Sequence, residues 1–167
     1  MDINFIAYVQ TIILYLQQKC IKDTAMKLHK YQIVNVGSIA GHMACSRNSI
    51  YCASKYAVTG MVEGLRQEML TTPNVVLTNF YPYYINTGMF DGFNPLMGKI
   101  IPTMDQNYVA DRMYQAIMAE EEEVYIHSFI YWFKLLTLFI PLYVKTRVFQ
   151  YMVGAGMDTW VGRNKKD

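Results

Sequence analysis

The stretch NVGSIAGHMACSRNSIYCASK, residues 35–55, is rich in small and polar side chains but lies between two apolar segments. On its N-terminal side, the β-branched residues Ile33, Val34 and Val36 predict a short strand that ends at Gly37. On its C-terminal side, residues from about 50 to 70 predict a long helix. The glycine-containing loop therefore joins the end of a strand to the start of a helix.

A second strand is predicted over residues 75–81, VVLTNFY, and is ended by Pro82. Strand, loop, helix and strand form a βαβ unit, which builds a parallel sheet with a right-handed crossover. The continuous apolar runs predict that both faces of the sheet are covered. Asp105 is a candidate cap for a further helix, and residues 124–126 are a candidate last strand. The predicted fold class is α/β with a doubly wound parallel sheet.

The loop and the helix after it place three reactive side chains in a spacing that suits acid–base chemistry. Tyr51 and Lys55 are four residues apart, so they leave the same face of a helix. A nearby ammonium stabilises a phenolate, so we expect Lys55 to lower the pKa of Tyr51. Ser38 follows the end of a parallel strand, where such sheets form their ligand crevice. Its hydroxyl could bond the oxygen atom on which Tyr51 acts.

The spacing of Tyr51 and Lys55 alone is a weak signal in a chain with 14 tyrosines. Tyr15 and Lys19 have the same spacing but lack a serine thirteen residues upstream. The better interpretation of Tyr15 and Lys19 is that they occupy two functionally unrelated positions on one helix. The combination with Ser38 makes the Tyr51 pair specific.

The segments IVNVGSIAGH and YCASKYAVTGMVEGLRQEM closely resemble the classical short-chain dehydrogenase/reductases. The resemblance implies a catalytic serine at Ser38, a proton-exchanging tyrosine at Tyr51 and a ribose-binding lysine at Lys55. It also implies a fourth catalytic residue, an asparagine that holds a relay water, at Asn4 in DINFIA. A helix-capping or surface amide is the alternative for Asn4.

The segment YPYYINTGMF resembles the loop that contacts the nicotinamide cofactor in this family. The resemblance implies that Tyr51, Lys55, Pro82, Ile85 and Thr87 bind NAD or NADP. Tyr83 replaces the usual glycine of that loop. Residues 86–90, NTGMF, resemble the microsomal retinol and hydroxysteroid dehydrogenase branch, although a plain turn is an alternative.

The resemblance covers only the second half of the family domain. No Gly-x-x-x-Gly-x-Gly turn, which would cradle the cofactor pyrophosphate, occurs in the sequence. We therefore expect a partial Rossmann-like sheet, in a fragment or splice product of a longer protein. We also expect the isolated chain to be inactive and its strand edge to make it prone to association.

Residues 126–144, IHSFIYWFKLLTLFIPLYV, carry a single charge, on Lys134. Lys134 and Pro141 argue against a membrane-spanning helix and favour one that lies in the interface with Lys134 reaching the headgroups. A hydrophobic cap on the domain or on a partner subunit is the alternative. We expect residues 1–125 to form the dehydrogenase half and residues 126–167 a hydrophobic, membrane-associated segment. The expected location is the cytosolic side of the endoplasmic reticulum or a lipid droplet.

Composition excludes several other classes of protein. The net charge of +2 is too small, and the basic residues too scattered, for a nucleic-acid surface. The three cysteines form no CxxC motif, which favours a reducing compartment, and no histidine pair has metal-ligand spacing. No secretory leader is predicted, because Asp2 follows Met1 without a basic segment.

The leading prediction is thus an oxidoreductase that acts on the CH–OH group of a lipid alcohol or its ketone, as a homodimer in full-length form. The rival prediction is an inactive fragment that serves as a membrane-peripheral or dimerisation module. In family dimers the helices that correspond to residues 5–19 and 50–70 pack against the partner subunit, and both helices are present here.

Overall fold

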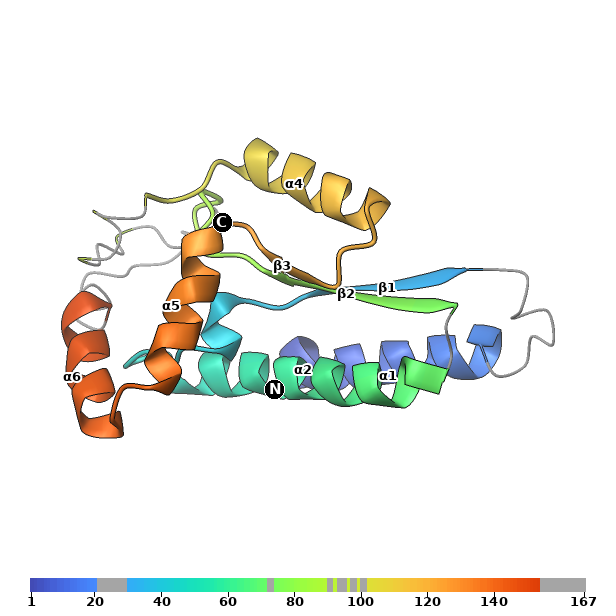
Figure 1. The fold of residues 1–167 in the computed structure, drawn as a ribbon, viewed down its shortest axis with the longest axis horizontal. Coiled ribbons are helices and arrows are strands. Elements are labelled where there is room, and N and C mark those ends of the chain that lie inside the picture. Colours follow the sequence, from blue (N-terminus) through green and yellow to red (C-terminus); the bar gives the residue numbers. More distant parts are fainter. Residues whose placement is uncertain are drawn as a thin grey trace, which may run out of the picture.

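The computed structural model describes residues 1–20, 30–71, 74–89, 92, 96, 99 and 102–153. Their centre is a parallel three-stranded sheet in the order β1 (Tyr31–Val36), β2 (Val75–Tyr81) and β3 (Glu123–Tyr125) (Figure 1). The long helix α2 (Ser49–Glu68) connects β1 to β2. The predicted α/β class with a parallel sheet is confirmed.

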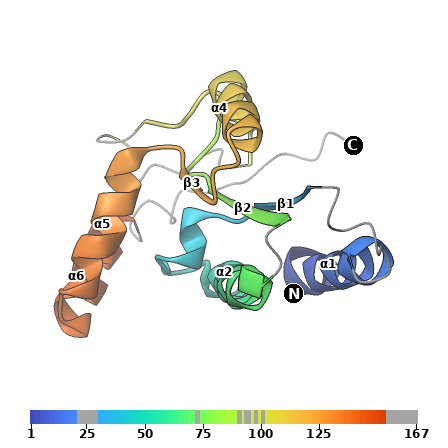
Figure 2. The same cartoon turned by 45° about the vertical axis from the view of Figure 1, so that its right-hand side comes forward.

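Helices cover both faces of the central strand. The helices α1 (Ala7–Tyr15) and α2 lie on one face and α4 (Gln106–Met118) on the other (Figure 2). On the first face Ile12, Ile33 and Leu77 form one buried cluster, and on the second Phe80 and its neighbours from α4 and β3 form another. Strand β2 is consequently buried along nearly its whole length, and the doubly wound arrangement is confirmed.

The edge strand β1 is covered less than predicted. Val34 and Val36 are 37% and 39% exposed, because α4 packs mainly over β2 and β3. Its hydrogen bond to β1 lies near the start of that strand, where the Gln32 side chain donates to the Ile117 carbonyl at 3.1 Å. Within the described residues, β1 pairs with β2 alone. The prediction that both sheet faces are covered is therefore correct for β2 and wrong for β1.

The first helical segment is also more exposed than its apolar sequence indicates. Helix α1 is flanked by π-helical turns over Asp2–Ile6 and Leu16–Cys20. Ile12 is its only buried residue, because α1 contacts the rest of the fold along one stripe. The mostly apolar sequence of residues 2–19 predicts a buried helix. The helix is present, but its predicted burial is wrong.

Two features of the segment around α4 can be compared with prediction. Asp105 caps α4, since its carboxylate accepts hydrogen bonds from the backbone N–H groups of Asn107 (2.9 Å) and Tyr108 (3.1 Å), as predicted. The four glutamates at residues 120–123 follow α4, and their sequence alone predicts a solvated helix end. Three of these carboxylates also form ion pairs, with Lys30 just before β1, Arg66 of α2 and Arg112 of α4.

The apolar segment after β3 forms two helices and not one. Helix α5 (Ser128–Leu138) ends shortly before Pro141, and α6 (Leu142–Met152) begins directly after it, because proline is favourable at the start of a helix and not inside one. Among the described residues, no helix combines the length and the apolar character that crossing a membrane requires. Lys134 does not extend outward as expected but donates to the Tyr125 hydroxyl at 2.9 Å.

Other sequence-based expectations concern segments outside the described residues. These are the surface segment over most of residues 20–30, the turn at Pro73, and most of the loop over residues 86–103.

The segment over residues 126–153 packs directly on the sheet domain. Ile126, Ile130, Phe149 and Val153 share one buried cluster with Met43 and Tyr83.

Candidate functional site

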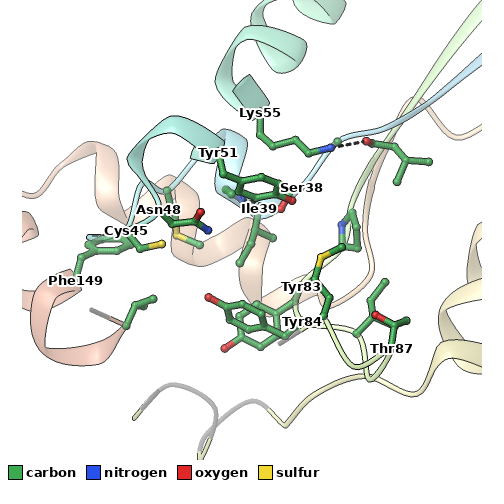
Figure 3. Close-up of a pocket in the computed structure, with 18 residues that line it drawn as sticks. Ser38, Ile39, Cys45, Asn48, Tyr51, Lys55, Tyr83, Tyr84, Thr87 and Phe149 are labelled. Atoms are coloured by element: carbon green, nitrogen blue, oxygen red, sulfur yellow. Dashed lines mark hydrogen bonds between the residues drawn. The ribbon is translucent and has the colours of Figure 1, made fainter. Parts of the chain in front are cut away.

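A cavity of about 240 Å³ lies at the carboxyl ends of β1 and β2 (Figure 3). Its walls come from the loop after β1, the first turns of α2, the segment after β2 and the last turns of α6. Six of the seven predicted site residues line it: Ser38, Tyr51, Lys55, Pro82, Ile85 and Thr87. The structure thus brings together residues that are up to 49 positions apart in the sequence, from Ser38 to Thr87.

The position of Ser38 follows from the parallel ends of β1 and β2. The backbone N–H of Ile39 donates to the Pro82 carbonyl at 3.2 Å, which ties the two strand ends together. The Ser38 hydroxyl accepts a hydrogen bond from the Ala40 N–H at 3.1 Å and so caps the short 3-10 turn Ile39–Gly41. Ser38 is therefore held at the mouth of the sheet by backbone contacts.

Gly41 lets the serine loop lie against α2. A Cβ atom at this position would be 2.7 Å from the Lys55 carbonyl oxygen and 2.4 Å from the Thr59 hydroxyl. Both distances are shorter than van der Waals contact, and one of the atoms is backbone that cannot turn away. The absence of a side chain at Gly41 thus allows Ser38 to approach Tyr51.

Tyr51 is a half-buried phenol beside Ser38. Burial raises the pKa of Tyr51 above its ordinary value of 10.0, and a hydrogen bond with the Ser38 side chain opposes that rise. We expected Lys55 to lower the pKa of Tyr51, and in this structure that expectation is wrong. The Lys55 ammonium lies 5.8 Å from the centre of the Tyr51 ring and donates to the Val36 carbonyl at 3.3 Å, so its charge is directed at the strand end.

Lys55 is 8% exposed, and burial lowers its pKa. Its ammonium lies between two aromatic rings, 5.7 Å from the centre of Tyr8 and 5.8 Å from that of Tyr51. The Tyr8 hydroxyl donates to the same Val36 carbonyl oxygen at 3.0 Å. Tyr8 therefore helps to define where the ammonium lies.

Sequence reasoning missed Tyr8. A signal was present, because Tyr8 is four residues after Asn4 and so shares its helix face. The predicted significance of Asn4 could have been extended to this neighbour by spacing alone.

Asn4 itself does not line the cavity. Its side-chain N–H₂ donates to the Ser54 hydroxyl at 3.4 Å, and Ser54 donates to the Tyr51 carbonyl at 2.6 Å. The structure thus places Asn4 against the turn of α2 that carries Tyr51 and Lys55. Its role as the ligand of a relay water stays a prediction.

The segment after β2 is fixed by a short parallel bridge. The Met104 N–H donates to the Tyr84 carbonyl at 2.8 Å, and the Asn86 N–H donates to the Met104 carbonyl at 2.9 Å, on either side of Ile85. Thr87 follows this bridge and is exposed. Tyr83, which replaces the expected glycine, is 5% exposed and packs edge-on against Tyr84.

The rest of the cavity wall is predominantly apolar. Ile39 and Met43 contribute from the serine loop, and Phe149 and Val153 contribute from α6. An apolar wall opposite a small group of polar side chains is typical of a site for a hydrophobic small molecule. Chemically, the site can hold one oxygen atom of such a molecule between two hydroxyl groups and a nearby ammonium.

The model of the short chain dehydrogenase family matches residues 1–96, which include Asn4, Ser38, Tyr51 and Lys55. The chain belongs to the short-chain dehydrogenase family. Human epidermal retinol dehydrogenase 2 is 27% identical over 99% of this short-chain dehydrogenase and 52% of its own length. Estradiol 17-beta-dehydrogenase 11 of Pongo abelii is 28% identical over 84% of the chain and 44% of that protein. The resemblance to retinol and hydroxysteroid dehydrogenases is confirmed.

A solved structure agrees with this assignment at the level of the fold. A short chain dehydrogenase from Burkholderia cenocepacia, crystallised in complex with NADP, superposes with a TM-score of 0.60 at 20% identity. The alignment covers 82% of this short-chain dehydrogenase and 53% of the bacterial chain. The chain spans about half the length of the curated relatives that it matches.

Proposed function

We propose that this chain carries the proton-transfer half of an oxidoreductase site that interconverts a lipid alcohol and its carbonyl compound with NAD or NADP. The observation that carries the proposal is the convergence of Ser38, Tyr51 and Lys55 on one largely apolar cavity at the ends of two parallel strands. This is the part of an α/β sheet where ligands bind.

Each of the three side chains has a separate task in this proposal. The Tyr51 hydroxyl gives a proton to the substrate oxygen during carbonyl reduction and takes it back during alcohol oxidation. The Ser38 hydroxyl bonds the same oxygen and holds it beside Tyr51. Because burial raises the pKa of Tyr51, the phenol is protonated at neutral pH, which is the form that donates to a carbonyl.

Three donors that line the cavity suit the nicotinamide end of the cofactor. Lys55 offers an ammonium and Tyr51 a hydroxyl, and both belong to the first turns of α2, while Thr87 adds a hydroxyl from the segment after β2. A bound nicotinamide cofactor supplies or accepts the hydride. Pro82 and Ile85 shape the wall that these donors share.

Two observations support a lipid as the substrate. The apolar wall formed with Phe149 and Val153 suits a hydrocarbon body. The names of the relatives specify retinol and estradiol, which are both hydrophobic alcohols. We accordingly propose the surface of the endoplasmic reticulum or of a lipid droplet as the location, and a homodimer as the assembled form.

A second candidate function, a dimerisation or membrane-peripheral module without activity, is favoured by the exposed surface of the N-terminal helix. Ile3 is 82% exposed, and Ile13 and Leu14 are 46% and 53% exposed. Such apolar side chains, next to the unpaired side of β1 in the described structure, fit a surface that another chain covers.

Cofactor titration separates the two candidates. NADH and NADPH are added to the chain while its tryptophan and tyrosine fluorescence is followed. The oxidoreductase proposal predicts saturable quenching at micromolar cofactor, which Lys55→Met weakens about tenfold or more. Lys30→Met is the matched control, because Lys30 is exposed and pairs with Glu120 far from the cavity. Fluorescence that does not respond to either cofactor supports the module.

A further inference from the structure

Helices α5 and α6 form a hairpin, here residues 128–152, that stands beside the sheet (Figure 2). The two helices contact each other through the rings of Phe133 and Phe149, whose centres are 5.8 Å apart. The inner face of the hairpin is buried against the domain through Ile130 and Phe149.

The end of the hairpin that carries the turn is unusually apolar for an exposed surface. Phe139 is 85% exposed, Leu142 77%, Tyr143 71% and Leu138 68%. Trp132, on the outer face of α5, is 65% exposed. Large side chains that are exposed together in this way mark a surface that meets another apolar phase.

The charges of the same segment have one sign. Residues 126–153 contain Lys134, Lys145 and Arg147 and no aspartate or glutamate. Arg147 lies over the ring of Tyr143, 5.4 Å from its centre, so a guanidinium accompanies the apolar end of the hairpin. Exposed apolar and aromatic side chains beside cations complement an anionic phospholipid headgroup layer. Two copies of the hairpin would instead bring like charges together.

We propose that the turn of the α5–α6 hairpin docks on an anionic phospholipid surface, with Phe139 and Leu142 below the headgroups and Arg147 and Lys145 among them. This contact differs from the single interfacial helix that the sequence predicts. Lys134 is not part of it, because its ammonium is held by Tyr125 on the inner side.

The hairpin also connects this surface to the cavity. Phe149 and Val153 form part of the cavity wall, whereas Leu142 and Tyr143 of the same helix are exposed at its other end. We infer that a lipid alcohol passes from the headgroup layer to the cavity along this helix. The inference that the substrate moves along α6 rests on the proposed function, whereas the inference of a docking surface does not.

Binding to vesicles tests the docking surface. The full chain is sedimented with phosphatidylcholine vesicles that contain or lack 30% phosphatidylserine, a composition on the order of that of anionic membranes. The double variant Phe139→Glu, Leu142→Glu is expected to bind at least about tenfold more weakly. Leu70→Glu is the matched control, since Leu70 is 78% exposed, like Leu142, but lies after α2; it should bind as the wild type does.

The basic side chains give a second, independent readout. Lys145→Gln and Arg147→Gln should each weaken binding to the anionic vesicles by roughly fivefold and leave the weak binding to neutral vesicles unchanged. With Trp160→Phe, Trp132 is the only tryptophan, and its emission should shift to shorter wavelength when vesicles are added.

Three results would overturn the docking surface. The first is that the wild-type chain does not bind vesicles, and the second is that Leu70→Glu weakens vesicle binding as much as the double variant does. The third is a double variant that loses self-association while its vesicle binding is unchanged. The last result would assign the hairpin to contact between copies of the chain.

Transfer of retinol separates the docking surface from the proposed function. Energy transfer from tryptophan to retinol should develop when wild-type chain meets retinol-loaded vesicles. The double variant should bind detergent-dispersed retinol normally but acquire it from vesicles at least about tenfold more slowly. Vesicle binding without any retinol binding would contradict the proposed function and leave the docking surface standing. Equal transfer rates in both proteins would contradict the path along α6.

Discussion

Gly41 controls the distance between the serine loop and α2. An added Cβ would meet the Lys55 carbonyl at 2.7 Å, so the loop or the helix must move. We expect Gly41→Ala to lower the free energy of unfolding by about 1–3 kcal/mol, as measured by urea denaturation. Gly60→Ala is the control, because nothing lies within 4 Å of a Cβ there, and it should raise stability by up to about 1 kcal/mol. Equal effects of the two changes would contradict the close approach.

Ser38 influences the ionisation of Tyr51. Their hydrogen bond lowers the pKa of Tyr51 against the larger effect of burial, so Ser38→Ala should move that pKa to still higher pH. Carbon-13 NMR of labelled tyrosine rings follows the titration, and Tyr51→Phe identifies the signal. A pKa of Tyr51 that stays the same or falls in Ser38→Ala would show that the two side chains do not interact.

At the scale of residues, the sequence indicates which side chains gather but not their electrostatics. Ser38, Tyr51 and Lys55 could be chosen from spacing, because the ends of a strand and a helix meet in any βαβ unit. The effect of Lys55 on the pKa of Tyr51 could not be predicted from spacing, since it depends on the Val36 carbonyl to which the ammonium is directed. Tyr8 reaches that carbonyl from α1, a contact that only the tertiary arrangement creates.

Helix α4 depends on one side chain at its start. Asp105 accepts hydrogen bonds from two N–H groups of the first turn, which would otherwise lack partners in the helix. We expect Asp105→Ala to lower the free energy of unfolding by about 1 kcal/mol, and Asp105→Asn to lower it by less, because asparagine is also a good cap. Thermal or urea unfolding measures both. An alanine variant as stable as the wild type would contradict the capping role.

At the scale of elements, the strands and helices follow from local patterns, and their surroundings do not. Strand β2 and helix α4 lie where apolar runs and a capping aspartate predict them. The exposure of α1 and of one face of β1 depends on which partners cover them, information that a local apolar pattern does not contain. The break at Pro141 could have been predicted, because proline opens α6 and excludes a continuous helix.

The whole molecule should lose stability in alkaline solution. Burial raises the pKa of Tyr81 from 10.0 to about 12, and it also raises those of Tyr83, Tyr84 and Tyr125. A tyrosine whose pKa is raised by folding makes its full contribution to the free energy of unfolding below pH 10. That contribution is lost as pH rises towards the folded-state value, and for Tyr81 it amounts to about 2–3 kcal/mol.

Urea denaturation at pH 8 and pH 11 measures this loss, with a lower free energy of unfolding expected at pH 11. Tyr81→Phe removes one titrating group and should make the dependence on pH shallower, although the change itself leaves the Asn79 amide without the 2.8 Å partner that Tyr81 provides. The same stability at both pH values would contradict the buried state of these tyrosines.

The central claim is that Tyr51 transfers the proton in alcohol–carbonyl interconversion. Its most direct test is the rate of NAD(P)H formation from retinol and estradiol by a fusion of this chain with the dinucleotide-binding half of epidermal retinol dehydrogenase 2. Tyr56→Phe is the matched control, a tyrosine on the same helix that lies outside the cavity. We predict that Tyr51→Phe abolishes turnover while cofactor binding is largely kept, and that Tyr56→Phe leaves turnover within about twofold. Turnover by the Tyr51→Phe fusion at a rate close to that of its Tyr56→Phe counterpart would contradict the account.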